Sequence, residues 1–149
     1  MKSLFSAQDN QEIIDRINKL TPETPAVWGK MNVGQMLCHC QQPLRVAYGE
    51  MKEKQTVIGR LFGGIAKKQL LGDKPMKRNL PTARSFVVTD AREFNHEKMQ
   101  LTELVRKFHS VGPSVLTKEA HPFFGKLTIE EWDKLSWKHL DHHLQQFGV

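Results

Sequence analysis

The sequence predicts an all-α protein that folds as an up-down four-helix bundle with an extra short helix and long connections. Three observations lead to this fold class. Apolar residues recur at helical spacing in five segments, stretches rich in proline and glycine separate those segments, and capping-box pairs open three of them. No repeat, low-complexity tract or linker divides the chain, so residues 1–149 are expected to form a single domain.

The first predicted helix covers about residues 6–20, and the turn-forming stretch TPETP ends it. The second covers residues 32–49 and opens with a capping box, because Asn32 is followed three positions later by Gln35. Pro43 lies inside this second helix and removes one backbone hydrogen bond, which predicts a kink.

The third predicted helix is short and covers residues 57–71. Residues 72–88 are rich in proline and turn-forming residues and predict a long surface connection, with residues 85–88 extended. The fourth helix is expected to begin near Asp90, with Glu93 as its capping-box partner, and to end at a Gly-Pro pair.

The last predicted helix begins at Thr128, whose capping-box partner is Glu131, and runs to residue 147. At about 100° per residue, His139 and His143 fall in the middle of its apolar stripe, and His142 falls about 110° away. The stripe consists of Trp132, Leu135, Leu140, Leu144 and Phe147.

Two inward-facing imidazoles one turn apart indicate a metal site. Burying them without partners would cost roughly 1–3 kcal/mol each, and a shared metal ion compensates that cost. His39, in the second helix, is the candidate third ligand. Three histidines would leave coordination positions open, which is typical of catalytic sites, and would accept zinc, nickel, iron or copper. The alternative is that His139 and His143 are hydrogen-bonded core residues.

Three stretches, WGKMNVGQMLCHC, GDKPMKRNLPT and HPFFGKLTIEEWDKLSWKHLDHHLQQFGV, resemble a bacterial branch of the DinB-like (DinB/YfiT) superfamily, and the resemblance covers nearly the whole chain. It implies a four-helix bundle with a three-histidine site for a divalent metal, most often nickel or zinc, with iron as a further choice. By position, His39, His139 and His143 would be the ligands. Some members of the superfamily are transferases that use a low-molecular-weight thiol, and others have no known activity.

Two classes of function therefore remain open. The first is a metal-dependent enzyme, either a thiol-using transferase or a hydrolase-like enzyme, acting on a small-molecule substrate. The second is a non-catalytic, stress-related module that binds a metal or a small ligand. Gln35 and His121 are candidate substrate-binding or supporting residues, but a capping role explains Gln35 and a loop-capping role explains His121 equally well.

Composition and charge limit the partners. No apolar run approaches the ~20 residues of a membrane span, the N-terminus lacks a signal sequence, and there are only two cysteines, so a cytoplasmic protein without a membrane partner is expected. The net charge of +6 could indicate a nucleic-acid or membrane-surface partner, but the basic residues are spread along the chain. The densest basic stretch, residues 67–84, carries no nucleic-acid-binding motif, so no such partner is expected. The oligomeric state stays open and includes a homodimer.

Overall fold

The computed structural model describes residues 2–53 and 57–149 and is all-helical in those ranges. It contains α1 (Ala7–Lys19), α2 (Val33–Ala47), α3 (Val57–Leu70), α4 (Phe94–Val111) and α5 (Ile129–Gln146). Two 3-10 turns, η1 (Arg84–Phe86) and η2 (Gly112–Val115), lie in the connections. No strand occurs in the described part of the chain, and the predicted all-α class is confirmed.

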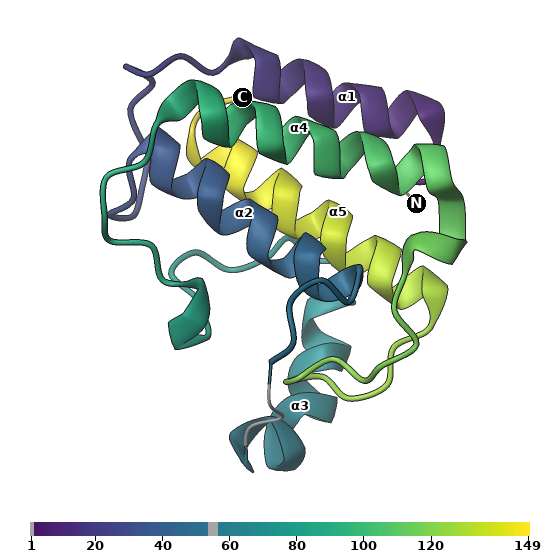
Figure 1. The fold of residues 1–149 in the computed structure, drawn as a ribbon. Coiled ribbons are helices and arrows are strands. Elements are labelled where there is room, and N and C mark those ends of the chain that lie inside the picture. The colour runs from purple at the N-terminus through teal and green to yellow at the C-terminus, as the bar shows by residue number, and fades with distance from the viewer. Residues whose placement is uncertain (1, 54–56) are drawn as a thin grey trace.

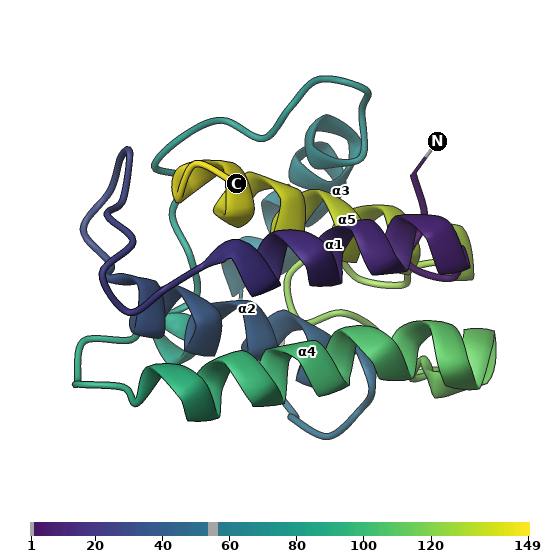
Figure 2. The ribbon, with the colours of Figure 1, turned by 90° about the horizontal axis from the view of Figure 1, so that it is seen from above.

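Four of the helices pack around one core, while α3 lies outside that core (Figure 1). α1 packs against α4 and α5, and α2 packs against the same two helices. The predicted alternation of up and down is wrong, because α2 and α4 run in the same direction (Figures 1 and 2). The long connection between them, residues 48–93, returns the chain to the end of the bundle where α2 begins.

The starts of α2 and α5 are set by local hydrogen bonds, as predicted. The Asn32 side chain accepts from the backbone nitrogen of Gln35, and the Gln35 side chain accepts from that of Asn32, at 2.9 and 3.0 Å. Thr128 and Glu131 form the same reciprocal pair at the start of α5. Each box satisfies backbone donors that the first helical turn leaves without partners.

The start of α4 differs from the prediction. The helix begins at Phe94, because the carboxylate of Glu93 itself caps it by accepting from the backbone nitrogens of Asn95 and His96. Asp90 instead forms an ion pair with Arg92 at 3.0 Å. The prediction that residues 85–88 are extended is also wrong in part, since the 3-10 turn η1 occupies residues 84–86.

The core lies where the apolar faces of α1, α2, α4 and α5 meet. Its fully buried members include Ile13, Ile17, Met36, Leu37, Leu44, Leu101, Phe108, Leu140 and Leu144. Packing of α2 against α5 along this core brings the middle of α2 to the second half of α5, where the histidines lie. None of the helices in the described ranges is both long and apolar enough to cross a bilayer.

Candidate metal centre

Three histidines meet where α2 packs against α5. His39 projects from the middle of α2, and His139 and His143 project from consecutive turns of α5. The ring centroids of His39 lie 5.1 Å from His139 and 4.7 Å from His143, and those of His139 and His143 are 4.6 Å apart. One ring nitrogen from each residue lies within 4.8 Å of the other two. The structure thus brings together the three residues that the sequence analysis proposed as ligands.

The spacing of two of these nitrogens matches that of metal ligands. The Nε2 atoms of His39 and His139 are 3.2 Å apart. Two nitrogens bound to one tetrahedral ion at ~2.05 Å would be about 3.3 Å apart. His39 and His143 are buried and His139 is half-buried, so the cluster is screened from water without being fully enclosed.

A backbone carbonyl determines which nitrogen of His39 faces the cluster. The Nδ1 atom of His39 lies 2.9 Å from the carbonyl oxygen of Phe86, in η1. Because a carbonyl oxygen only accepts hydrogen bonds, Nδ1 carries the proton and donates it. The Nε2 atom of His39 is then unprotonated, which leaves its lone pair for a metal ion. Metal-binding histidines usually make this second hydrogen bond.

A side-chain amide determines in the same way which nitrogen of His143 faces the cluster. The Nδ1 atom of His143 lies 2.8 Å from Oε1 of Gln146, and Nε2 of Gln146 donates to the carbonyl oxygen of Trp28 at 2.7 Å. The carbonyl of Trp28 fixes the orientation of the amide, so Oε1 faces His143 and accepts from its Nδ1. Gln146 was not predicted from the sequence, although its position three residues after His143 places it on the same helix face.

The electrostatics of the cluster favour neutral imidazoles. Burial lowers the pKa of His39, lowers that of His143 to about 3, and lowers that of His139 well below its usual value. The neighbouring imidazoles lower the pKa values of His139 and His143 further, since two cations this close would repel each other. All three rings are therefore neutral at pH 7, which is the form that binds a metal.

His142 lies beside the cluster and outside it, as predicted. Its ring centroid is 5.1 Å from that of His143 and 5.8 Å from that of Trp28, against whose ring it stands edge-on. The guanidinium carbon of Arg78 lies over the same indole, 4.1 Å from its centroid. His142 therefore contacts the surrounding loops and is not one of the three grouped histidines.

The two other candidate site residues have capping roles. Gln35 is half-buried, completes the capping box of α2 and donates to the carbonyl oxygen of Asp90 at 3.2 Å. His121 is buried in a loop, where its Nδ1 accepts from the backbone nitrogens of Phe123 and Phe124 at 3.0 and 3.2 Å. Neither residue belongs to the three-histidine group.

The two cysteines that flank His39 also lie outside the group. Cys40 points into the core, where its Sγ donates to the sulfur of Met36 at 3.6 Å. Cys38 is buried on another side of α2, beside Gln42. Burial raises the pKa of both thiols, so neither forms the thiolate that binds metals at neutral pH.

Comparison with known proteins corrects the family assignment. The model of a family described as "Protein of unknown function (DUF1569)" matches residues 2–148. No curated protein and no solved structure matches the chain. The DinB-like assignment is therefore wrong, because the chain is matched over nearly its whole length by a different family. Without the DinB-like assignment, the expected relationship to thiol-dependent transferases is no longer supported. The evidence for the histidine site is its geometry.

Proposed function

We propose that this chain, which belongs to the DUF1569 family, binds a divalent transition-metal ion through His39, His139 and His143. The observation that carries the proposal is the convergence of three neutral imidazoles, two of which have their Nδ1 protons held by the oxygens of Phe86 and Gln146. Hydrogen-bonded core histidines would need no such convergence of ring nitrogens. Without a metal ion, the Nε2 atoms of His39 and His139 would be joined by one hydrogen bond, with a single proton between them.

The ligand set favours zinc or nickel, with iron as a third choice. Imidazole nitrogen suits all three ions, whereas magnesium and calcium prefer oxygen ligands. Among the described residues, no Asp or Glu joins the three histidines, so a hard cation finds no carboxylate there. Three protein ligands leave at least one coordination position for a small molecule.

The open position suits a small ligand that reaches the half-buried His139 side of the cluster. A bound ion would supply Lewis acidity there and would lower the pKa of a coordinated water or thiol. No carboxylate of the described residues belongs to the group, so no acid–base partner is assigned. We therefore infer metal-dependent binding of a small molecule as the primary function, and a low-molecular-weight thiol is one ligand to test, because a bound metal ion would hold it as the thiolate.

Metal analysis of protein purified without an affinity tag tests the proposal, together with calorimetric titration by zinc and nickel. We expect a single ion per chain in the wild type and at least about a 100-fold loss of affinity in His139→Ala, since two imidazoles hold an ion far more weakly than three. His142→Ala is the matched control, because this neighbouring histidine lies outside the group. Equal affinities for the wild type and His139→Ala would overturn the proposal.

A second experiment separates binding from turnover. In cobalt-substituted protein, addition of a small thiol should change the visible absorption spectrum, since a thiolate would occupy the open position. Turnover of a thiol with an electrophile, lost in His139→Ala and kept in His142→Ala, would show an enzyme. Spectral change without turnover supports the binding role. No spectral change with any thiol would remove thiols as ligands of the site.

A further inference from the structure

The outward face of α3 is apolar. Val57, Leu61 and Ile65 lie one turn apart, and each is at least 70% exposed, while Phe62 beside them is 57% exposed. In the part of the chain that the structure describes, no other helix exposes as many large apolar side chains. The apolar stripes of the other four helices face the core, whereas the apolar side chains of α3 point away from it.

Contacts on the inner face of α3 hold it in this orientation. Gly63 lies so close to the loop of residues 121–126 that a Cβ atom there would collide with the carbonyl oxygen of Phe123. Lys67 forms an ion pair with Glu131 of α5 at 2.9 Å. A larger side chain could not replace Gly63 without displacing the helix, so glycine places the apolar side chains on the outside.

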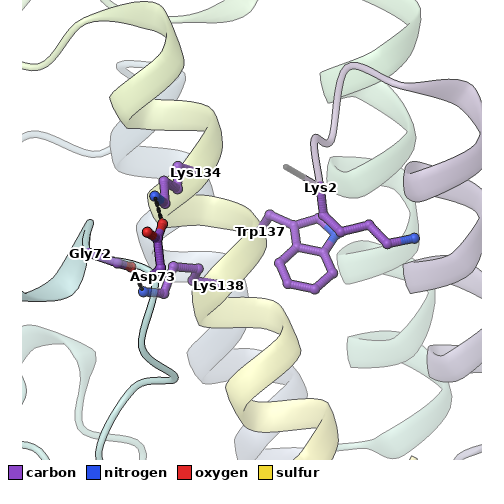
Figure 3. A pocket seen from close by; sticks show the side chains of 6 residues that line it. All are labelled: Lys2, Gly72, Asp73, Lys134, Trp137 and Lys138. Carbon is purple, nitrogen blue, oxygen red and sulfur yellow. Dashed lines mark hydrogen bonds and ion pairs between the residues drawn. The ribbon is translucent and has the colours of Figure 1, made fainter.

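The end of α3 is tied to α5 as well. Lys138 donates to the carbonyl oxygens of Leu70 and Gly72, each at 2.6 Å, and Lys134 forms an ion pair with Asp73 at 3.1 Å (Figure 3). Gly72, Asp73 and the two lysines help to line a groove of about 340 Å³, and both lysines already have partners there. The groove therefore serves to anchor α3, and its lysines are not free to bind an anion.

The charge around the outward face is positive. α3 contains no acidic residue, and the exposed Lys68 lies about 20° from Val57 around the helix, on the same face. The whole chain carries a net charge of +6. A partner for this face should combine an apolar layer with negative charge.

We propose that α3 lays its outward face on an anionic lipid surface. Apolar side chains would enter the boundary between headgroups and acyl chains, and Lys68 would contact the headgroups, as in amphipathic helices that lie in the plane of a membrane. The inference is independent of the metal site. It replaces the expectation of no membrane partner, which rested on the lack of a segment that could span a bilayer and on the spread of the basic residues along the chain.

A second copy of the chain fits this face less well. A stable interface takes about 20–30 residues from each partner, whereas α3 offers four large apolar side chains. Two copies would also bring together like net charges of +6. A lipid surface needs no complementary shape, and its negative charge attracts the protein.

Co-sedimentation of the full chain with vesicles tests the proposal. We expect the wild type to pellet with vesicles of phosphatidylcholine mixed with phosphatidylserine, and not with phosphatidylcholine alone. The double variant Leu61→Gln, Ile65→Gln should lose at least about tenfold in vesicle affinity, because two side chains that enter the lipid become polar. The matched control is Met99→Gln, Val111→Gln, which changes two exposed apolar residues of α4 and should bind like the wild type.

Circular dichroism of each variant checks that the fold is kept. The proposal is overturned if the wild type does not pellet, if it pellets equally with both compositions, or if both double variants bind as well as the wild type. Light scattering measures the oligomeric state and so tests whether a second copy of the chain covers α3. A wild-type dimer that Leu61→Gln, Ile65→Gln converts to a monomer would show that a second copy covers α3, which also overturns the proposal.

Discussion

At the three-histidine cluster, two oxygens outside it decide which ring nitrogens are left for a metal. The carbonyl oxygen of Phe86 and the amide oxygen of Gln146 each accept from an Nδ1 proton. The first comes from the long connection between α2 and α4, and the second from the last turn of α5. The site thus depends on residues that are not themselves ligands, and each of them can be tested separately.

Gln146→Ala should lower zinc or nickel affinity by roughly 10–100-fold, because His143 would lose the partner that fixes its tautomer and ring orientation. The measurement is competition against a coloured chelator. Gln145→Ala is the control, since the side chain of this exposed neighbour donates to Asp141, at 2.8 Å. Equal affinities for the two variants would contradict a supporting role for Gln146.

His121 should make the metal-free protein sensitive to acid. Burial lowers its pKa from 6.5 to about 4, and its Nδ1 must stay unprotonated to accept from Phe123 and Phe124. The unfolded chain therefore binds the proton first, so stability falls as the pH drops from about 6.5 towards 4. The difference corresponds to a loss on the order of 3 kcal/mol.

Replacing His121 by Asn isolates this effect, because the Asn oxygen can accept the same hydrogen bonds and does not titrate. Urea unfolding at about pH 7 and about pH 4.5 should show a smaller loss of stability in His121→Asn than in the wild type. The three clustered histidines contribute to both proteins alike. The same loss in both proteins would rule out His121 as the cause.

At the scale of helices, the features that depend on neighbouring residues were predictable. The capping boxes at Asn32 and Thr128 set the starts of α2 and α5, and the 100° step correctly placed His139 and His143 together and His142 outside. The start of α4 was not predictable from the pattern alone. Asp90 and Glu93 both suit a helix start, and the structure shows that Glu93 is the cap while Asp90 pairs with Arg92, two residues along the chain.

The features that depend on distant segments were not predictable. The sequence of residues 48–93 does not indicate that this connection leads the chain back to the end of the bundle where α2 begins. That return is what makes α4 parallel to α2. The hydrogen bond from His39 to Phe86 depends on the same return. The reversed orientation of α3 is also hidden in the sequence, where its apolar residues have the spacing of a core-facing stripe. The glycine that reverses it is recognisable only beside Phe123.

Gly63→Ala and Gly64→Ala form a matched pair that tests this docking. Both add a methyl group to α3, and alanine favours a helix over glycine by about 1 kcal/mol. A Cβ at Gly64 meets nothing within 4 Å, so this variant should protect the α3 amides from hydrogen exchange. A Cβ at Gly63 meets the backbone of Phe123, so this variant should expose them. Similar exchange in both variants would show that α3 is not held through Gly63.

At the scale of the whole molecule, we predict that the basic stretch of residues 67–84 is not a nucleic-acid site. Lys67 is paired with Glu131, and Arg78 lies over the ring of Trp28. We expect no tight binding to duplex DNA or to RNA in a gel-shift assay near physiological salt. Tight binding that weakens steeply as salt is added would contradict this prediction, because that dependence is the signature of phosphate contacts.

The proposed metal site joins α2 to α5, so its occupancy should change the stability of the whole molecule. An ion that binds only the folded chain adds about 2.7 kcal/mol when its free concentration is 100 times the Kd. For a chain of this length, that gain raises Tm by roughly 5–10 °C. Differential scanning calorimetry of chelator-treated protein, with and without zinc or nickel, measures the shift.

His39→Ala should abolish the shift in Tm, because it removes the single ligand that α2 contributes. His142→Ala should keep it, and magnesium should produce none in any variant, since that ion prefers oxygen ligands. The ion should also slow amide exchange at η1, because the carbonyl of Phe86 holds the Nδ1 proton of His39. A zinc-induced rise in Tm that persists in His39→Ala would place the ion elsewhere on the chain. In that case the clustered imidazoles would be neutral core residues that share a hydrogen bond between His39 and His139.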